Sequence, residues 1–430
     1  MTLFFSVTNV FAQSWEIVGN QMFAGPWSDL LELEMINDVP HIVYIDYNSW
    51  EIRLSKFENN TWSVPANGVI ADEAGGTYRS VVDADGNLYV AFNDSDHSGD
   101  VSVKKWDGNS WQNVGVPGFG IDVRDGYAMQ ISCLSDNSLV VAYPAAHSWE
   151  AGDLDVLHFN GTIWEPIGLD IVGDTIGYIS MGILSNDNIY INYRTDNEES
   201  RVVKYNGTTW DIQTTPFDGY STYRSFMQVG GNDEIIGWRA DYGGDEYVFY
   251  TANNDVWEPM ASPNHLGVHP LDYSWAVEYN TIDNSWYAGY TVSTSYGSYF
   301  KKFDGTDWNQ VGDSIIYNPG GFRYSDLEFN SVGVPFYTTT SAYNLMSLTG
   351  TAGLESNNSL ADFTLFPNPS SSQITLSFNT QEAQFSLFDM NGKELFSKVV
   401  ANQESIDVSS FEKGMYIVKI DGVAKRLVID

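Results

Sequence analysis

The sequence is poor in the features that mark several common protein classes. It has one cysteine, Cys133, in 430 residues, so no internal disulfide can form, and we predict a small buried residue of a strand. No stretch approaches the roughly 18 consecutive apolar residues of a membrane-spanning helix, so we expect no transmembrane segment. No window shows a sustained helical period. Aromatic residues make up 15% of the chain, and we predict an all-β protein.

Positive charge is scarce as well. The chain has 20 Lys and Arg against 56 Asp and Glu, which gives a formal net charge of −36. Nucleic-acid binding depends on clustered basic side chains, so this balance excludes nucleic acid as an ordinary partner. The sequence also lacks a phosphate loop, a zinc motif and a nucleophile elbow, which argues against the enzymes that use them.

What the sequence does contain is a repeated hairpin. Residues 101–115, VSVKKWDGNSWQNVG, predict two antiparallel strands around an Asp-Gly turn, for which we predict type I′ geometry. Related hairpins recur, and the Trp that opens each second strand stands 46 to 53 residues after the one before: Trp15, Trp62, Trp111, Trp164, Trp210, Trp257 and Trp308. A period near 50 residues with four strands per period is typical of propeller blades.

A second hairpin precedes the tryptophan hairpin in each period. Its first strand, strand a, begins with an aromatic residue, and its second, strand b, ends on one. The tryptophan hairpin supplies strands c and d. Seven a-b hairpins and seven c strands can be counted, but only six d strands follow them. The strand at Trp15 has no c strand before it. We therefore predict a seven-bladed β-propeller over residues 13–350, closed by its N-terminal strand.

The ends of the chain differ from the propeller in composition. Residues 1–12, with an apolar run and a small residue at Ala12, predict a secretory signal peptide that lacks the usual basic start. Residues 351–361 are small and polar, as expected of a linker. Residues 362–430 predict a small antiparallel sandwich of about seven strands with an Ig-like architecture, a hairpin turn at Asn391-Gly392, and Pro367 and Pro369 at its edge.

The last 70 or so residues resemble the type A C-terminal sorting domain of the type IX secretion system of Bacteroidetes. The motifs occur in the family's order: FPNP at 366–369, LFDMNGK at 387–393, GMYIVK at 414–419 and KRLV at 425–428. The resemblance implies export through the periplasm, contact with the type IX translocon and sortase, and release or attachment to surface lipopolysaccharide. The residues that it marks as the sorting signal are Pro367, Asn368, Pro369, Gly392, Gly414, Tyr416, Lys425 and Arg426.

The propeller loosely resembles sialidase-like propellers, through its Asp-Gly turns, and propeller lectins, through its W-x-x-[IV]-G repeats. No copy carries the full S-x-D-x-G-x-x-W pattern of the Asp box. The alternative is that these turns and tryptophans only stabilise the outer hairpin of each blade, because turn chemistry alone accounts for Asp-Gly and Asn-Gly.

We predict the ligand site at the other face of the ring, which we call the mouth. It is formed by the ends of the b strands, the starts of the a strands and the loops that follow them. Arg forks can bind carboxylate or sulfate, and aromatic rings can stack on sugars. The candidates are Tyr78, Arg79, Arg124, Tyr127, Tyr178, Tyr223, Arg224, Arg239, Tyr273, Arg323 and Tyr324. The alternative is that these arginines pair with nearby acids and join the blades.

Asp94, Asp96 and Asp100 have the spacing of the first half of a calcium loop, but Lys105 stands where the bidentate Glu belongs. We expect an acidic solvated loop, with calcium as the open alternative and no other cofactor. Overall we expect a monomeric, secreted or surface-attached propeller that binds an extracellular glycan or lipopolysaccharide. The alternatives are a lyase or glycosidase acting on anionic polysaccharide, with His147, His265 and His269 as candidates, and a purely structural surface protein.

Overall fold

The computed structural model describes most of the chain. Its described residues are 14–19, 31–46, 48–72, 77–120, 129–145, 152–215, 222–241, 247–253, 255–260, 270–292, 297–312, 315–317, 325–339, 344–349, 364–377, 382–388, 393–411, 413–420 and 423–429. Residues Trp15–Leu348 form one compact unit, and strands from β31 onward belong to a second. The predicted signal peptide and linker lie outside the described residues, so their boundaries remain predictions.

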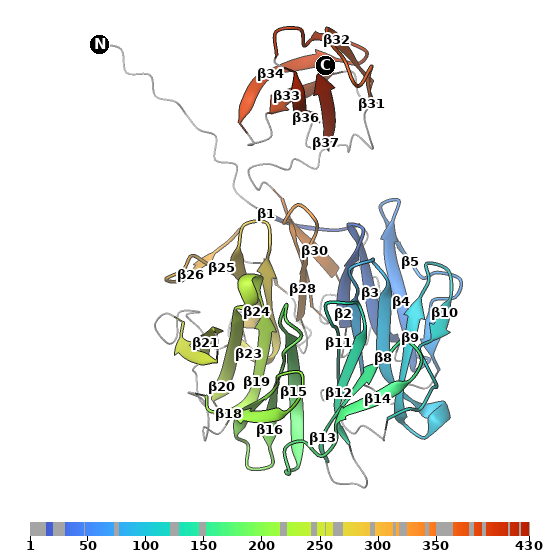
Figure 1. Cartoon of the computed structure of the whole chain (residues 1–430), viewed down its shortest axis with the longest axis vertical. Helices are drawn as coiled ribbons and strands as arrows, with labels where there is room; N and C mark the ends of the chain where they lie inside the picture. Colours follow the sequence, from blue (N-terminus) through green and yellow to red (C-terminus); the bar gives the residue numbers. More distant parts are fainter. Residues whose placement is uncertain are drawn as a thin grey trace. The chain divides into compact units, whose positions relative to one another are not determined.

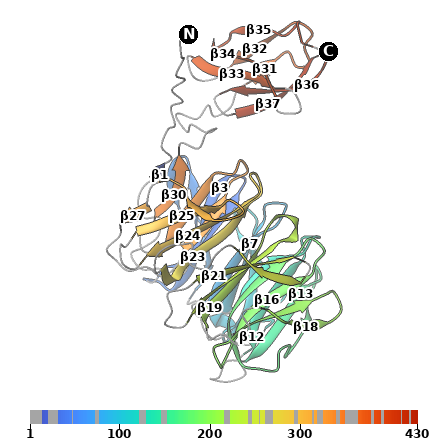
Figure 2. The same cartoon turned by 90° about the vertical axis from the view of Figure 1, so that its left-hand side faces the viewer.

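Seven antiparallel sheets make up the first unit, one per blade (Figures 1 and 2). Blade 1 holds β2 (Leu31–Ile36), β3 (Val39–Asp46), β4 (Glu51–Glu58), β5 (Thr61–Ser63) and β6 (Val69–Ala71), and blade 2 holds β7 (Tyr78–Val82), β8 (Leu88–Asp94), β9 (Asp100–Trp106) and β10 (Trp111–Asn113). Blade 3 holds β11 (Gln130–Cys133), β12 (Leu139–Ala145), β13 (Asp153–Phe159) and β14 (Trp164–Gly168). Blade 4 holds β15 (Ile176–Ile183), β16 (Ile189–Thr195), β17 (Ser200–Tyr205) and β18 (Trp210–Gln213).

The remaining three blades follow the same order of strands. Blade 5 holds β19 (Thr222–Val229), β20 (Ile235–Asp241), β21 (Tyr247–Asn253) and β22 (Val256–Pro259). Blade 6 holds β23 (Pro270–Asn280), β24 (Ser285–Val292), β25 (Gly297–Phe303), β26 (Trp308–Gln310) and β27 (Ile315–Tyr317). Blade 7 holds β28 (Ser325–Phe329), β29 (Pro335–Thr339), β30 (Asn344–Thr349) and β1 (Ser14–Ile17). The predicted seven-bladed propeller is confirmed.

The N-terminal strand closes the ring, as predicted. β1 pairs with β30 in blade 7, and the Val18 N–H donates a 2.8 Å hydrogen bond to the Leu345 carbonyl. The Trp15 ring packs edge-on against Phe300, with centroids 4.7 Å apart. The a strands contact one another in the cyclic order β2, β7, β11, β15, β19, β23, β28 and back to β2. Blade 7 therefore joins the first and last parts of the propeller sequence.

The b strands carry the core because they are covered on both faces. In β12, the side chains of Leu139, Val141 and Tyr143 pack toward blade 2, while Val140 and Ala142 pack toward blade 4. Successive side chains of a strand point to opposite faces, so a strand between two neighbours must be apolar at every position. This explains why LVVAYPA reads as an unbroken apolar run and why all of it is buried.

The tryptophan hairpins stabilise the blade to which they belong. In five of them the Trp ring packs on an aromatic residue at or next to the end of strand c, with ring centroids 5.0 to 5.3 Å apart: Phe57–Trp62, Trp106–Trp111, Phe159–Trp164, Tyr205–Trp210 and Phe303–Trp308. The predicted type I′ turn is wrong. Trp106 pairs directly with Trp111, so four residues form the loop, and Asp107 Oδ1 accepts hydrogen bonds from the Asn109 and Ser110 amides. Only Gly108 of the Asp-Gly pair has a positive φ.

The same tryptophans also join neighbouring blades. The indole N–H of Trp164 donates a 2.8 Å hydrogen bond to the Val114 carbonyl of blade 2, and that of Trp210 donates a 2.9 Å bond to the Ile167 carbonyl of blade 3. Trp62 bonds in this way to Val18, and Trp15 to Val311 at 3.5 Å. Each acceptor is the [IV] of a W-x-x-[IV]-G repeat in the preceding blade.

The glycine of that repeat makes room for the next tryptophan. A side chain at Gly115, which has φ +75°, would meet Trp164 Cδ1 at 2.9 Å, and one at Gly312, with φ +70°, would meet Trp15 Nε1 at the same distance. The copies that begin at Trp62, Trp210 and Trp257 lack the [IV]-G pair. In the blades that follow the Trp62 and Trp257 copies, the indole nitrogens of Trp111 and Trp308 have no acceptor among the described residues.

A second set of hydrogen bonds joins neighbouring blades at the a-b turns, on the face opposite the mouth. The amide and hydroxyl of Ser135 donate to the Asp187 carboxylate at 2.7 and 2.8 Å, and Ser185 binds Asp233 in the same manner. Ser331 of blade 7 binds Asp38 of blade 1, with both bonds at 2.7 Å. The interface between blades 7 and 1, which closes the ring, therefore has the same Ser–Asp contact as the interfaces between blades 3 and 4 and between blades 4 and 5.

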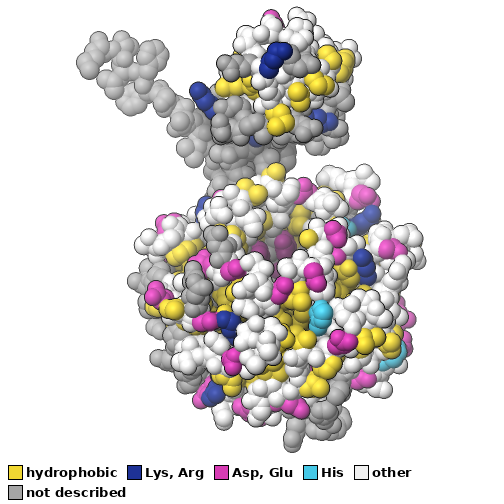
Figure 3. Space-filling model, in the orientation of Figure 1, with side chains coloured by type: hydrophobic (Ala, Val, Ile, Leu, Met, Phe, Trp, Pro, Cys, Tyr) yellow, Lys and Arg dark blue, Asp and Glu magenta, His cyan; other side chains and the backbone are white. Residues whose placement is uncertain are grey.

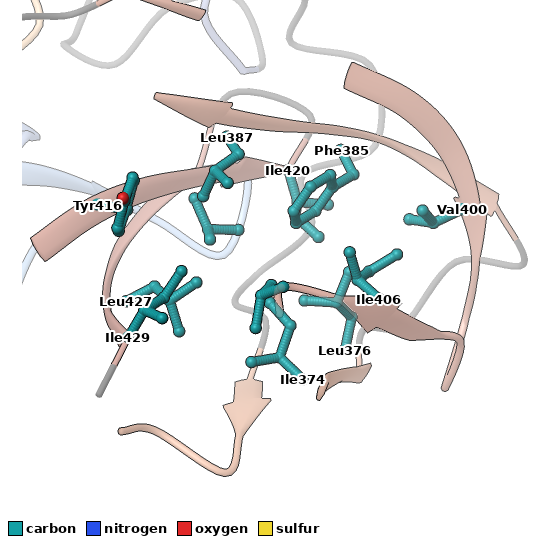
Figure 4. Close-up of a cluster of buried hydrophobic side chains, with 12 residues drawn as sticks. Ile374, Leu376, Phe385, Leu387, Val400, Ile406, Tyr416, Ile420, Leu427 and Ile429 are labelled. Atoms are coloured by element: carbon teal, nitrogen blue, oxygen red, sulfur yellow. The ribbon is translucent and has the colours of Figure 1, made fainter. Parts of the chain in front are cut away.

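The C-terminal unit is an Ig-like sandwich of seven described strands, as predicted. One sheet has the order β31 (Thr364–Phe366), β32 (Gln373–Ser377), β35 (Ser405–Asp407), and the other has the order β34 (Glu394–Ala401), β33 (Glu382–Phe388), β36 (Gly414–Ile420), β37 (Val423–Ile429). Ile374, Leu376 and Ile406 of the first sheet meet Phe385, Leu387 and Val418 of the second in one core (Figure 4). The Asn391-Gly392 turn lies outside the described residues.

The contact between blades can be tested with a matched pair of variants. Trp164→Phe keeps an aromatic ring but leaves the Val114 carbonyl without its donor, so the free energy of unfolding should fall by about 1 kcal/mol more than in Trp111→Phe, whose indole N–H has no acceptor to lose. Chemical denaturation of the two variants and the parent measures the difference. Equal losses would show that the hydrogen bond adds nothing to stability.

Candidate functional site

The mouth is formed by the starts of the a strands and the turns between strands b and c. Several predicted site residues cannot be placed there. Arg124, Tyr127, Arg323 and Tyr324 lie outside the described residues, as do His147, His265 and His269. The structure places the backbone of four more in strands β19, β20 and β23, without their side chains: Tyr223, Arg224, Arg239 and Tyr273. Their roles as ligand-binding residues remain predictions.

Tyr78 and Arg79 turn out to contact other parts of the protein. The Tyr78 ring is fully buried between blades 1 and 2, and its hydroxyl donates a 3.2 Å hydrogen bond to the Val43 carbonyl. Arg79 Nη1 lies 3.2 Å from Glu32 Oε1 of blade 1. The buried ring of Tyr78 has no exposed face on which a sugar could stack, so we remove Tyr78 from the predicted ligand-binding residues. Arg79 joins two blades in this structure.

Three other predicted aromatic positions share a departure from regular strand pairing. Gly177 pairs with Arg194 and Ser180 with Asn192, so the register shifts at Tyr178. The register also shifts at Tyr223 in blade 5, and in the stretch of blade 6 that contains Tyr273. Tyr78, by contrast, pairs regularly with Phe92. Bulges are over-represented next to functional sites, where they redirect side chains out of the regular pleat.

Tyr178 shows what such a shift does. Its φ is +45°, a conformation that is strained for a bulky side chain. Its ring is half-buried, with the Arg194 guanidinium carbon 5.5 Å from the ring centroid. Arg194 Nη2 in turn lies 2.9 Å from Glu198 Oε1 in the b-c turn of the same blade. The bulge thus places an aromatic ring, a cation and a carboxylate together at the mouth.

Trp50 is a mouth residue that the sequence analysis did not single out. It ends the b-c turn of blade 1 with φ +60°, and its side chain is 52% exposed. Among the propeller residues whose side chains the structure describes, every other Phe, Tyr or Trp is buried or half-buried. The sequence signal was a tryptophan inside an otherwise polar stretch, Asn48-Ser49-Trp50-Glu51, between two predicted strands.

The axis of the ring holds a cavity of about 560 Å³ that was also not predicted. All seven a strands line it, and five carboxylic acids face it: Glu32, Glu34, Glu278, Asp326 and Glu328. Few cationic or amide groups among the described residues contact these acids. Arg79 pairs with Glu32, Gln228 Nε2 donates to Glu278 Oε2 at 2.5 Å, and Asp326 Oδ2 accepts from the Leu33 amide at 2.6 Å.

Burial controls the protonation of these acids. It raises the pKa of Glu34 to about 8 and that of Glu278 to about 7. It also raises the pKa of Glu32, although the Arg79 charge opposes the shift, and it raises the pKa values of Asp326 and Glu328 well above their ordinary range. The carboxyl groups therefore bind protons more tightly in the folded ring than in an unfolded chain.

In the predicted calcium loop, both carboxylate oxygens of Asp94 contact protein groups. Asp94 Oδ2 accepts from Ser102 Oγ at 2.6 Å and lies 2.9 Å from His97 Nδ1, and Asp94 Oδ1 accepts from the Asp96 amide. Asp94 is 8% exposed, and it caps a short 3₁₀ helix at Ser95–His97. Within the described part of the chain, no group of three or more His, Cys, Asp or Glu is arranged to hold a metal ion. Calcium binding remains untested.

In the C-terminal unit, the fold brings distant sorting motifs together. Asn368 Oδ1 accepts a 2.8 Å hydrogen bond from the Val428 amide, so the FPNP segment that holds Pro367 and Pro369 lies against β37. Lys425 and Arg426 belong to β37, which pairs with β36, where Gly414 is the first residue and Tyr416 is buried. Gly392 lies outside the described residues. The roles of these residues in sorting remain predictions.

The buried acids of the cavity make a testable prediction about pH. Because their folded-state pKa values are raised above about 4, the stability that they contribute is complete at low pH and is lost as the pH rises toward the folded-state values near 7 and 8. The free energy of unfolding should fall between pH 5 and pH 9, and Glu34→Gln should reduce the slope. The exposed Glu165→Gln is the control. Stability that increases over this range would contradict the assignment.

Several solved structures are similar to part of this chain. A fucose-specific lectin from Aleuria aurantia is 14% identical, with 70% of this chain and 100% of that chain covered and a TM-score of 0.48. An ulvan lyase of a new polysaccharide lyase family, bound to -[GlcA(1-4)Rha3S]-, is 11% identical, with 78% and 94% covered and a TM-score of 0.48. A protein of unknown function from Dyadobacter fermentans is 13% identical, with 64% and 94% covered and a TM-score of 0.41.

A search of curated proteins found no match. No helix among the described residues is long and apolar enough to span a membrane. The C-terminal unit, in contrast, matches a family model. Residues 364–429 match the model described as "Secretion system C-terminal sorting domain", which confirms the resemblance to type IX sorting domains and implies export to a secreted or surface location.

Proposed function

We propose that this exported propeller binds a glycan at its mouth, as an adhesion or carbohydrate-recognition module. The observation that carries the proposal is the set of register shifts at Tyr178, Tyr223 and Tyr273 in three successive blades. Regular pairing at these positions would direct the rings into the blade interfaces, as it does at Tyr78. A bulge can redirect a side chain out of the regular pleat, and the half-buried Tyr178 ring at the mouth is suited to stacking on sugars.

Strain at Tyr178 supports the same function. A residue with φ +45° and a large side chain costs roughly 1 to 2 kcal/mol relative to an ordinary conformation, and glycine would avoid the cost. Strained residues of this kind are concentrated at ligand sites, where the geometry itself is required. The Arg194–Glu198 ion pair holds polar hydrogen-bonding groups beside the ring.

The cavity favours a second candidate, an enzyme that acts on polysaccharide. Carboxylic acids with pKa values near neutrality, such as Glu278 at about 7, suit proton transfer at physiological pH. Incubating the full chain with anionic polysaccharides, followed by assays for new reducing ends and for unsaturated products, tests this activity. Turnover that is lost in Glu278→Gln would establish the enzyme and displace the binding proposal.

The binding proposal is tested by replacing Tyr178 with the residue that its backbone prefers. Tyr178→Gly should lower affinity for the best ligand on a glycan array by about ten-fold, while thermal stability is unchanged or increased, because glycine relieves the positive φ. Tyr78→Phe, which removes only a buried hydroxyl, is the control and should bind like the parent. A Tyr178→Gly variant that binds like the parent, or a parent that binds no glycan, would contradict the proposal.

A further inference from the structure

The b-c turn of blade 1 has features that the blade-4 site does not explain. β3 ends at Asp46 and β4 begins at Glu51, and the turn is closed by hydrogen bonds from the Ser49 and Trp50 amides to the Asp46 carbonyl at 3.0 and 2.6 Å. This turn holds Trp50 in the left-handed region with half of its side chain in solvent. Neither the conformation nor the exposure is favourable for tryptophan, so the position is poorly explained by stability alone.

A polar pair follows Trp50 in the sequence, at the start of β4. Glu51 and Arg53 are two residues apart on β4, so their side chains lie on the same face of the sheet. Glu51 Oε2 accepts hydrogen bonds from Ser49 Oγ and Arg53 Nε, both at 2.8 Å, and also from Arg53 Nη2. Three donors on one oxygen fix the orientation of both side chains.

This pair still has hydrogen-bonding capacity in reserve. Among the described residues, no hydrogen bond reaches Glu51 Oε1 or Arg53 Nη1. The Glu51 and Arg53 side chains are 23% and 28% exposed. Hydrogen bonds from Ser49 and Arg53 lower the pKa of Glu51, so it stays ionised and can only accept, while Arg53 can only donate. A sugar hydroxyl can do both, so one acceptor and one donor suit two neighbouring hydroxyls.

The charged groups around the blade-1 turn favour a neutral sugar over an anionic one. All four propeller arginines whose side chains the structure describes are paired with a glutamate: Arg53–Glu51, Arg79–Glu32, Arg194–Glu198 and Arg201–Glu199. Asp46 Oδ2 lies 3.7 Å from Arg53 Nε and adds a second negative charge to the blade-1 turn. Acidic side chains are spread over the propeller face in Figure 3, where basic ones are few. A uronate or sulfate would meet repulsion here, because no arginine side chain that the structure describes in the propeller is left unpaired to offset it.

We propose that Trp50, Glu51 and Arg53 form a subsite for one uncharged sugar unit, which stacks on the indole while its hydroxyls bind Glu51 Oε1 and Arg53 Nη1. The inference rests on the proposed glycan-binding function and assigns the ligand class. It departs from the expectation of an anionic ligand, which was based on the number of arginines near the mouth. Indole rings and rigid ion pairs lose little conformational freedom on binding, which favours affinity at a small exposed site.

The test uses the full chain and a glycan array that carries neutral, uronate-bearing and sulfated oligosaccharides. The parent should prefer neutral ligands, with an affinity that is insensitive to added salt. Calorimetric titration with the tightest neutral oligosaccharide should show affinity about ten-fold weaker for Trp50→Asn, and most of the affinity retained by Trp50→Phe. Asn tolerates the left-handed conformation, so thermal stability should not fall. Ile163→Ala, at an exposed c-d turn on the opposite face, is the control.

The outcomes separate this inference from the function on which it rests. If Trp50→Asn binds like the parent while Tyr178→Gly loses affinity, the mouth binds glycan but the blade-1 subsite is wrong. A parent that binds only uronates or sulfated sugars also overturns the subsite. If the parent binds no glycan, both proposals fail. Glu51→Gln leaves Arg53 with less compensation and should shift selectivity toward uronates; an unchanged selectivity would contradict the role of Glu51.

Discussion

The propeller depends on contacts between neighbouring blades, because a four-stranded sheet covered on neither face buries too little apolar surface to be stable alone. The b strands show this constraint most clearly, since β12 is apolar on both faces and each face packs against a different blade. The W-x-x-[IV]-G repeat adds a directional link between blades at the outer hairpins. Its carbonyl accepts the next indole N–H, and its glycine leaves room for the ring.

The structure separates the parts that stabilise the ring from the mouth. The Trp hairpins and the Ser–Asp pairs lie at the c-d and a-b turns, where the side chains bond to neighbouring blades. Among the described propeller residues, those with a positive φ that are not Gly, Asn or Asp all lie at the mouth: Trp50, Ser98, Tyr178 and Glu198. A ring stabilised at one face can tolerate unfavourable conformations at the other, which is the arrangement expected of a scaffold that presents a ligand site.

Much of the fold was predictable because strand periodicity and the tryptophan repeat are local signals. The count of strands was sufficient to predict that Trp15 completes blade 7. The site was harder to predict. The sequence has an aromatic residue at the start of every predicted strand a, but only the pairing register determines whether a ring is buried, as Tyr78 is, or lies on a bulge, as Tyr178 does. The acidic cavity could not be predicted because it depends on which face of seven separate strands meets at the axis. Trp50 was missed because a turn residue has no periodicity.

Ring closure is the central claim, and native-state hydrogen exchange tests it directly. The amides of Val18, Val114 and Val311 occupy equivalent positions in three blades, and they donate to Leu345, Val103 and Phe300 at 2.8, 2.9 and 2.9 Å. Val114 and Val311 belong to blades whose strands are continuous in the sequence, whereas Val18 reaches its partner only if the two ends of the propeller meet. A closed ring predicts similar protection for all three amides. Rapid exchange at Val18 alone, with Val114 and Val311 protected, would show that the ring is open.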